Sequence, residues 1–302
     1  MEFNGVINVY KEKGYTSHDV VAIIKRTLKV KAGHTGTLDP DAEGVLPIVL
    51  GKSTRLADYI MAEDKVYEAV IHFGVETDTQ DMSGNTLMDN RPVNVQKERL
   101  LAALDKFKGA ISQTPPMYSA IKIDGKKLYD LARKGIEVER KRRQITIHDI
   151  ELIEMHPEHA RILVSCSKGT YIRTLCADIG AELGCGAAMG ALLRRASGDF
   201  MMEGAIKLDD LRALASEERI GEYIISPDEF FKECPKVYAK DEAIKSIRNG
   251  NKFSVDLVMS NKLEIDGKYR LYANQQFVGL YILEPSGLFK PEIILLDLKE
   301  VL

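Results

Sequence analysis

The sequence predicts an α+β protein built on a largely antiparallel mixed sheet, with a smaller β domain at its C-terminal end. Strand-like and helix-like segments are mixed along residues 1–234 with several expected hairpins, but without the regular repeat of a doubly wound sheet. From about Pro235, short strand-like segments alternate with the turn sequences NGN, DGK and EPSG. At 302 residues the chain exceeds the usual size of one domain. We therefore expect domains at 1–234 and 235–302, with the acidic stretch 215–234 as a linker.

Local patterns predict the elements of the first domain. A capping box at Thr16–Asp19 starts a helix that runs to about Lys29. Residues 31–44 lack periodicity and are expected to form a loop before a buried strand at 45–51. Alternation predicts a strand at 67–75, and a further strand is expected at 161–167, whereas helical spacing predicts a helix at 93–107. Another helix is expected to be entered through Gly169 and left through Gly184.

Composition places the chain among soluble globular proteins. It is 45% hydrophobic and 29% charged, which is typical of a packed domain and not of a disordered or fibrous chain. No apolar run approaches the roughly eighteen residues of a membrane span, and the first residues do not resemble a signal peptide. We expect a cytoplasmic protein without membrane contact. The four cysteines never approach a CxxC spacing, so neither a disulfide framework nor a metal site is expected.

The loop GHTGTLDPDAEG, residues 33–44, is the segment most suggestive of chemistry. Its glycines allow close backbone approach, and Pro40 biases Asp39 towards an extended conformation, which would fix a carboxylate beside a cleft. The alternative is a structural turn in which Asp39 bonds its own backbone, and spacing alone favours that alternative. A lone loop histidine such as His34 is likewise more often a surface residue, and the loop has no zinc-ligand spacing.

Positive charge gathers in one part of a chain whose formal net charge is -3. Residues 113–143, called the basic segment below, contain nine Lys or Arg and four Asp or Glu. Such a local excess predicts contact with nucleic-acid phosphates, the alternative being a solvated basic hairpin. The side chains predicted to bind RNA are Lys122, Lys126, Lys127, Arg140, Lys141, Arg142 and Arg143.

Five motifs in order resemble those of the bacterial TruB-type tRNA pseudouridine-55 synthases. They are KEKGYTSHDVV, GHTGTLDPDAEGVLPIVLGKSTRL, KVYEA, QTPPMYSAIKIDGKKLYDLARKGIEVERKRR and SKGTYIRTL. The resemblance covers nearly the whole chain and implies a pseudouridine synthase fold with a C-terminal PUA-like RNA-binding domain. It also implies isomerisation of uridine 55 in the T arm of tRNA. No cofactor, metal, guide RNA or obligatory protein partner is expected. The basic segment resembles the family's thumb insertion.

The resemblance also implies roles for single residues. Asp39 matches the catalytic aspartate, Tyr67 the tyrosine that stacks on the target base and is the favoured general base, and Arg173 the arginine that pairs with the aspartate. His34 matches the histidine that helps to flip the nucleotide. Tyr171 and Leu192 match residues of the pocket wall. Ala188 departs from the pattern, because many relatives carry His there, which puts an RNA contact at this position in doubt.

Two questions stay open at this level. Asp39 is expected to act by attack on sugar C1′, by attack on base C6, or by stabilising a glycal intermediate, and the sequence does not separate these routes. The expected task of Arg173 is to offset desolvation of the carboxylate, since an aspartate is already ionised at neutral pH.

The alternatives to a guide-independent enzyme are a tRNA-folding chaperone whose turnover is dispensable and a guide-dependent dyskerin-like enzyme. The thumb-like segment and the lack of long terminal extensions favour the guide-independent enzyme.

Overall fold

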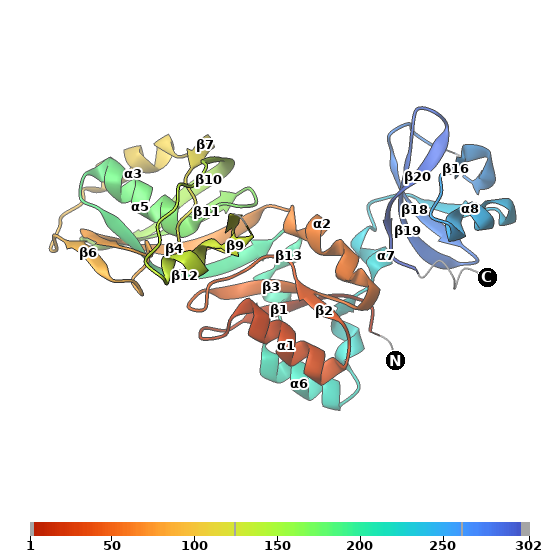
Figure 1. Cartoon of the computed structure of the whole chain (residues 1–302), viewed down its shortest axis with the longest axis horizontal. Helices are drawn as coiled ribbons and strands as arrows, with labels where there is room; N and C mark the ends of the chain where they lie inside the picture. Colours follow the sequence, from red (N-terminus) through yellow and green to blue (C-terminus); the bar gives the residue numbers. More distant parts are fainter. Residues whose placement is uncertain (1–2, 124, 261, 297–302) are drawn as a thin grey trace.

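The computed structural model describes residues 3–123, 125–260 and 262–296 and contains two large β-sheets (Figure 1). The first is a mixed sheet that is antiparallel except where β3 and β12 run parallel. The second forms a separate C-terminal β domain. The predicted α+β class is therefore confirmed. No helix in the described part of the chain is long and apolar enough to cross a membrane.

The first sheet has ten strands, eight of them in one continuous order. In that order they are β14 (Ile224–Ile225), β1 (Gly5–Lys11), β3 (Glu43–Leu50), β12 (Ala187–Ser197), β4 (Lys65–Phe73), β11 (His159–Cys166), β10 (Arg143–Met155) and β7 (Gly109–Gln113). β2 (Ala32–His34) pairs with β3, and β13 (Phe200–Met201) pairs with β12. Two small hairpins, β5 (Val75–Thr77) with β6 (Thr86–Asp89) and β8 (Lys122–Ile123) with β9 (Lys126–Lys127), stand apart from it.

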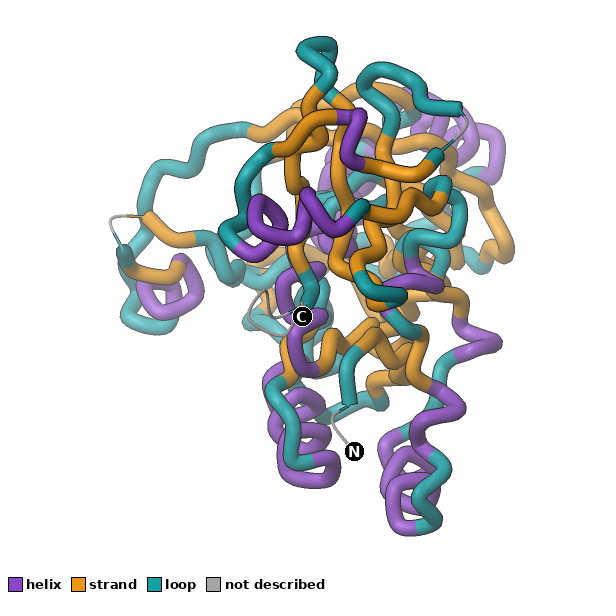
Figure 2. The backbone as a smooth tube through the Cα atoms, turned by 90° about the vertical axis from the view of Figure 1, so that its right-hand side faces the viewer, coloured by secondary structure: helices purple, strands orange, loops and turns teal. Residues whose placement is uncertain are grey.

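Helices cover the two halves of the first sheet separately. α1 (Ser17–Leu28) and α6 (Leu208–Ser216) pack on the half that contains β1 and β3, and α3 (Lys97–Lys106) and α5 (Ile172–Leu183) pack on the half with β10 and β11 (Figure 1). Figure 2 shows the helices mostly at the margins of the molecule. The shorter helices are α2 (Ala57–Met61), α4 (Leu128–Ala132), α7 (Pro227–Phe230) and α8 (Ile244–Arg248). The junction of the two halves is the parallel contact between β3 and β12.

Local sequence explains how the helices beside this junction start and stop. Thr16 and Asp19 form the predicted capping box, in which each side chain bonds the other residue's backbone N–H. α5 starts one residue after Tyr171 and ends at Gly184, whose φ of 75° is the left-handed conformation that glycine adopts without strain. The predicted loop 31–44 differs in one respect, because Ala32–His34 pair with β3 as a short strand.

The acidic stretch 215–234 is more than the predicted linker. Ile224 and Ile225 extend the first sheet by pairing with β1, and Ile220 and Phe231 are buried. Exposed acidic residues and inward-packed apolar residues are mixed in this stretch. The end of this stretch packs against the C-terminal β domain, because Phe231 shares an apolar cluster with Leu280 and Leu295.

The second sheet has six strands. In order they are β16 (Phe253–Ser254), β20 (Leu288–Ile294), β19 (Gln276–Leu283), β18 (Lys268–Ala273), β15 (Lys236–Ala239) and β17 (Val258–Met259). Leu280 and Leu295 of the C-terminal domain share an apolar cluster with three residues of the first domain, Val49, Ile60 and Phe200. The two sheets are thus connected by an apolar interface and not only by the chain.

Candidate active site

The loop that carries Asp39 is held at three points. The Leu38 amide donates to Ser17 Oγ (2.9 Å), which ties the loop to the first turn of α1. The Ala42 amide donates to the Asp39 carbonyl (3.1 Å). Lys11, which is fully buried, donates from Nζ to the carbonyls of Pro40 (3.1 Å) and Ala42 (2.6 Å). Burial lowers the pKa of Lys11 to about 8, partly offset by carboxylates that include Asp39. These bonds fix the backbone on both sides of Asp39.

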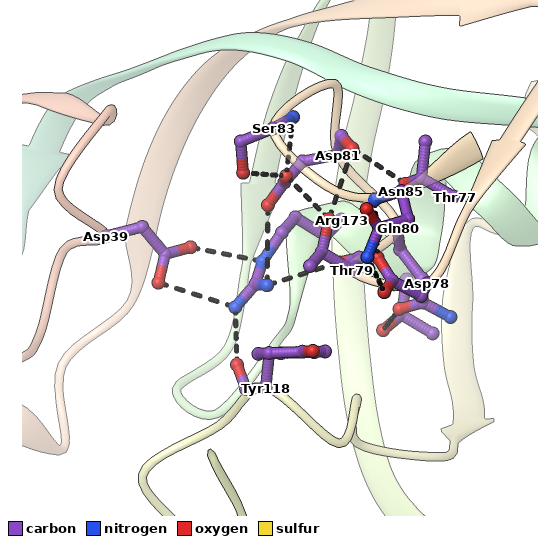
Figure 3. Close-up of polar contacts among 11 residues, drawn as sticks. Asp39, Thr77, Asp78, Thr79, Gln80, Asp81, Ser83, Asn85, Tyr118 and Arg173 are labelled. Atoms are coloured by element: carbon purple, nitrogen blue, oxygen red, sulfur yellow. Dashed lines mark hydrogen bonds and ion pairs between the residues drawn. The ribbon is translucent and has the colours of Figure 1, made fainter. Parts of the chain in front are cut away.

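Arg173, in the first turn of α5, binds the Asp39 carboxylate through two nitrogens (Figure 3). Its Nε lies 3.1 Å from Oδ2 and its Nη2 lies 3.3 Å from Oδ1. The arginine side chain is only 7% exposed, whereas the Asp39 side chain is 41% exposed. Arg173 therefore holds the carboxylate from the protein interior, while solvent reaches its other side.

Burial raises the pKa of the Asp39 carboxyl, and the adjacent Arg173 guanidinium lowers it. Asp81 raises it further by repulsion. The direction agrees with the task expected for Arg173 from the sequence, which is to oppose the desolvation of the carboxylate. The net pKa of Asp39 is raised, so Arg173 offsets part of the cost of burying the ionised carboxylate.

Asp81 is a site residue that the sequence did not predict. It lies in the turn between β5 and β6, and its Oδ2 accepts from Arg173 Nη1 (3.4 Å) on the side opposite Asp39 (Figure 3). Its Oδ1 accepts from Thr79 Oγ1 (2.8 Å) and Ser83 N (3.0 Å). The run TDTQDMSGN is rich in turn-forming residues, and that is the signal in the sequence. Nothing in the run indicates that the turn packs against α5.

Three further predicted residues lie near the Asp39 loop. Tyr67 in β4 and Leu192 in β12 are each 9% exposed and belong to one apolar cluster with Leu38. Tyr171 precedes α5, and both its backbone groups bond the Gln113 side chain (2.8 and 3.0 Å). Burial raises the pKa of both tyrosines. The structure thus brings Tyr67, Tyr171, Leu192 and the Asp39–Arg173 pair into one region.

His34 ends β2 at the start of the Asp39 loop. Its ring is half-buried and meets the ring of His18 edge to face, with centroids 5.2 Å apart. Burial lowers the pKa of His34 to about 4, and the charges of His18 and Arg194 add to this effect. His34 is therefore a neutral ring at pH 7. Ala188, the departure from the family pattern, is fully buried in β12.

The basic segment contacts the site through its backbone. Arg173 Nη2 donates to the Tyr118 carbonyl (2.8 Å; Figure 3). Two of the predicted RNA-binding residues also have structural bonds, since Arg140 donates to Pro115 O (3.2 Å) and Arg142 to Ser112 O (2.9 Å). Lys126, Lys141 and Arg143 are exposed. The side chains of Lys122 and Lys127 lie outside the described residues.

Neither disulfides nor a metal cluster are found among the described side chains. All four cysteines are free, with Cys166 and Cys176 buried. In residues 3–123, 125–260 and 262–296, no group of three or more His, Cys, Asp or Glu is arranged to hold a metal ion.

Two family models match consecutive parts of the chain. Residues 25–172 match the TruB family pseudouridylate synthase N-terminal domain, and residues 173–230 match the tRNA pseudouridylate synthase B C-terminal domain. The second match covers α5 to α7 and ends before the second sheet begins.

Curated relatives resemble the chain over almost its full length. The tRNA pseudouridine synthase B of Clostridium perfringens (strain SM101) is 44% identical over 297 residues, which cover 97% of this chain and 99% of the relative. The tRNA pseudouridine synthase B of Bacillus pumilus is 40% identical over 301 residues, which cover 97% of each chain.

Solved structures share the fold. A chain from a Cbf5-Nop10-Gar1 complex superposes with a TM-score of 0.71 at 28% identity, covering 98% of this chain and 86% of that one. A chain from an H/ACA RNP bound to a substrate RNA containing 2′-deoxyuridine gives a TM-score of 0.70 at 26% identity, covering 97% and 85%.

Proposed function

Because the chain belongs to the TruB family of pseudouridylate synthases, we propose that it isomerises uridine 55 in the T loop of tRNA to pseudouridine without a guide RNA. The relatives that it resembles over nearly their whole length are named tRNA pseudouridine synthase B, which supports tRNA as the substrate. Its identity to those relatives exceeds its identity to the solved chain from a Cbf5-Nop10-Gar1 complex. That difference supports an enzyme that acts alone.

The geometry of Asp39 carries the catalytic part of this proposal. Its carboxylate is bonded from behind by Arg173 Nε and Nη2 and is 41% exposed on its other side. A turn residue that bonds only its own backbone needs no buried arginine. Pairing with a cation maintains the charge when RNA covers the opening and excludes water. Asp39 is thus suited to act on a nucleotide that enters the opening.

The reaction requires one bond exchange and one proton exchange. The N1–C1′ bond of uridine breaks, the C5–C1′ bond forms, C5 loses its proton and N1 gains one. Tyr67, which lies in the same region as Asp39, is the proposed base for the C5 proton. Attack of Asp39 on C1′, attack on C6 and stabilisation of a glycal all fit this arrangement. None of the three routes consumes an energy source.

The target base reaches this opening only after it leaves the RNA stack, which costs a few kcal/mol. We assign His34 to this step, because its neutral, half-buried ring stands at the start of the Asp39 loop. Tyr171 and Leu192 then form part of the apolar wall around the base. The exposed Lys126, Lys141 and Arg143 contact the phosphates of the T arm. Residues 235–302 act as a PUA-like RNA-binding domain that extends the tRNA contact.

Incubation of the purified protein with an unmodified tRNA transcript tests the function. Pseudouridine is mapped in the absence of any other protein or RNA, with a transcript carrying C at position 55 as the control. We expect modification at position 55 alone and none in the control. Modification elsewhere would contradict the assigned position. A protein that binds and refolds the transcript without forming pseudouridine would instead be a chaperone, and one that needs added guide RNA would be a dyskerin-like enzyme.

A further inference from the structure

Arg194, in β12, is a cation in the middle of the protein. Its side chain is only 1% exposed and is the largest of the fully buried side chains. Its Nε donates to the Val45 carbonyl (2.6 Å) and its Nη2 to the Gly36 carbonyl (3.2 Å). The ion pairs of the described residues include no carboxylate for it. A buried charge without a counter-charge opposes folding, so its presence needs a reason.

Arg194 and Tyr67 face each other on neighbouring strands. They are direct partners in the antiparallel pairing of β12 with β4, and both are buried on the same face of the sheet. Residues paired in this way have Cβ atoms about 5 Å apart, within reach of a long side chain. Arg195, the next residue along the chain, points to the opposite face and pairs with Glu68 Oε2 (Nε, 2.9 Å).

Several charged or ionisable groups act on the Tyr67 phenol. Burial is the largest influence and raises the pKa of Tyr67. Cys166 of β11 and Asp39 of the neighbouring loop raise this pKa as well. Arg194 opposes them through its positive charge. Among these groups, Arg194 is the one that favours the phenolate.

The same guanidinium braces the Asp39 loop. Gly36 and Val45, whose carbonyls accept from it, stand three residues before and six residues after Asp39. Gly36 has a φ of 144°, and a Cβ atom at this position would lie 3.5 Å from Arg194 Nη1. Gly44, where a Cβ would lie 2.2 Å from the Arg194 carbonyl oxygen, allows β3 and β12 to approach closely. One side chain therefore contacts both ends of the loop and faces Tyr67.

We propose that Arg194 is a positioning residue that fixes the Tyr67 phenol relative to Asp39 and stabilises its ionised form. This inference rests on the proposed function, in which Tyr67 accepts a proton from the base. The buried charge of Arg194 then serves catalysis, which explains why an apolar residue does not occupy the position. The phenolate formed beside Arg194 is the counter-charge that the arginine otherwise lacks.

Direct titration of the phenol tests the inference without relying on activity. 3,5-Difluorotyrosine is placed at position 67 of the full-length protein, because its phenol is more acidic than that of tyrosine and its ionisation is visible by ¹⁹F NMR. The titration runs from pH 6 to 10 in the otherwise unchanged protein, in Arg194→Gln and in Arg194→Lys. Arg195→Gln, which removes a neighbouring arginine on the opposite face, is the matched control.

We expect the phenol to titrate in the unchanged protein and in Arg195→Gln with the same midpoint. In Arg194→Gln the midpoint should rise by about 1 pH unit or more, or move beyond pH 10, because an opposite charge at 4–6 Å shifts a pKa by about 1 to 3. The midpoint in Arg194→Lys, which keeps the charge but not the forked geometry, should lie between those of the unchanged protein and of Arg194→Gln. Equal midpoints in Arg194→Gln and the unchanged protein, or no titration in either, would overturn the inference.

Single-turnover rates on the tRNA transcript provide the second readout. Arg194→Gln should form pseudouridine at least roughly tenfold more slowly than the unchanged enzyme while its tRNA affinity changes little and it stays folded at the assay temperature, which is the pattern of an interaction made in the reaction step. Arg195→Gln should keep the normal rate. Loss of rate only in proportion to loss of folded protein would reduce Arg194 to a structural role. An unmodified enzyme that never forms pseudouridine would refute the proposed function, whereas the NMR titration would still stand.

Discussion

Arg173 has bonding partners around its whole guanidinium. Asp39 binds on one side, Asp81 and the Thr79 carbonyl on the other, and the Tyr118 carbonyl accepts from Nη2. Loss of one carboxylate leaves the buried arginine with a second carboxylate and two carbonyls. At the scale of single residues, chemistry at Asp39 and stability of the fold are therefore separable.

Asp39→Asn should abolish pseudouridine formation without unfolding the protein. Asn keeps the size and the turn-forming ability of Asp, but it lacks the negative charge and is a poor nucleophile. The single-turnover rate should fall at least about 10³-fold, since removal of a covalent catalyst has cost about 10⁶-fold in another enzyme. Thermal melting, tRNA affinity and rate are measured on one preparation.

The matched control for this prediction is Asp41→Asn, the same chemical change at an exposed position of the same loop. It should retain the normal rate. If the Asp39→Asn variant turns over within tenfold of the unchanged enzyme, Asp39 is not the catalyst.

The lowered pKa of His34 should make the stability of the protein depend on pH. Its pKa of about 4 in the fold lies below the ordinary 6.5, so the unfolded chain binds more protons between these values. The stability that the neutral ring contributes is complete above pH 6.5 and is lost as the pH falls towards 4. Urea unfolding of the unchanged protein and of His34→Gln should therefore give free energies whose difference shrinks over this interval. Parallel curves from pH 7 to pH 4 would contradict the pKa assigned to His34.

At the scale of elements, the basic segment is anchored at both ends in the first sheet, while its middle part forms a hairpin and a short helix. Its ends continue into β7 and β10, which pair with each other, and Gln113 lies opposite Arg143. The hairpin of β8 and β9 with α4 projects between them, and the Tyr118 carbonyl contacts Arg173. One hydrogen bond therefore connects this segment to the Asp39–Arg173 ion pair.

Replacing Lys126, Lys141 and Arg143 by Gln should weaken tRNA binding and reduce its dependence on salt. Each lost phosphate contact lowers the slope of log affinity against log salt by about 0.7 to 0.9. Arg140 and Arg142 are left in place because their bonds to Pro115 and Ser112 shape the segment.

The control replaces Lys207, Arg212 and Arg219, exposed cations near acidic residues that include Asp209 and Glu222, and it should leave the slope unchanged. An identical slope in both triple variants would identify the basic segment as a solvated surface.

On the scale of the whole molecule, the C-terminal β domain is packed against the first sheet. Arg270, 9% exposed, donates to the carbonyls of Cys234 (2.8 Å) and Lys232 (3.0 Å) and to Asp228 Oδ1 (2.8 Å). Arg55 of the first domain reaches the Ile294 carbonyl (2.6 Å). These contacts hold the C-terminal β domain against the first domain (Figure 1).

Removal of residues 235–302 should raise the KM for tRNA and lower the melting temperature, with kcat nearly unchanged. Lost RNA contacts that are equally strong in substrate and transition state affect KM alone. The fall in melting temperature follows because Phe200, Phe231 and their neighbours lose their apolar cover.

Leu280→Ala in the full chain distinguishes the two effects. It weakens the interface at a cost of about 2 to 5 kcal/mol but keeps the domain's surface, so it should lower the melting temperature without changing KM. A folded truncation with a collapsed kcat would show instead that the C-terminal domain shapes the catalytic site.

The local elements and the pairing of Asp39 with Arg173 follow from the sequence alone. The capping box at Thr16 and the glycine that ends α5 depend on contacts within a few residues, so their patterns predict them. The family motifs likewise indicate Asp39 and Arg173 as partners, and the structure contains their bond. Such features are visible because the interacting atoms lie in one motif or in motifs that the family keeps together.

The meeting of distant segments, in contrast, is settled by the packing of the complete chain. β12 runs between β3 and β4, which places Arg194 opposite Tyr67 although 127 positions separate them in the chain. The turn that carries Asp81 packs against α5. The acidic stretch 215–234 contains a strand of the first sheet and part of the interface with the C-terminal β domain. A strand's alternation shows that one face is buried but not which strand will pair with it or in which register. Those choices depend on the whole core, and they assign Asp81 and Arg194 to the site.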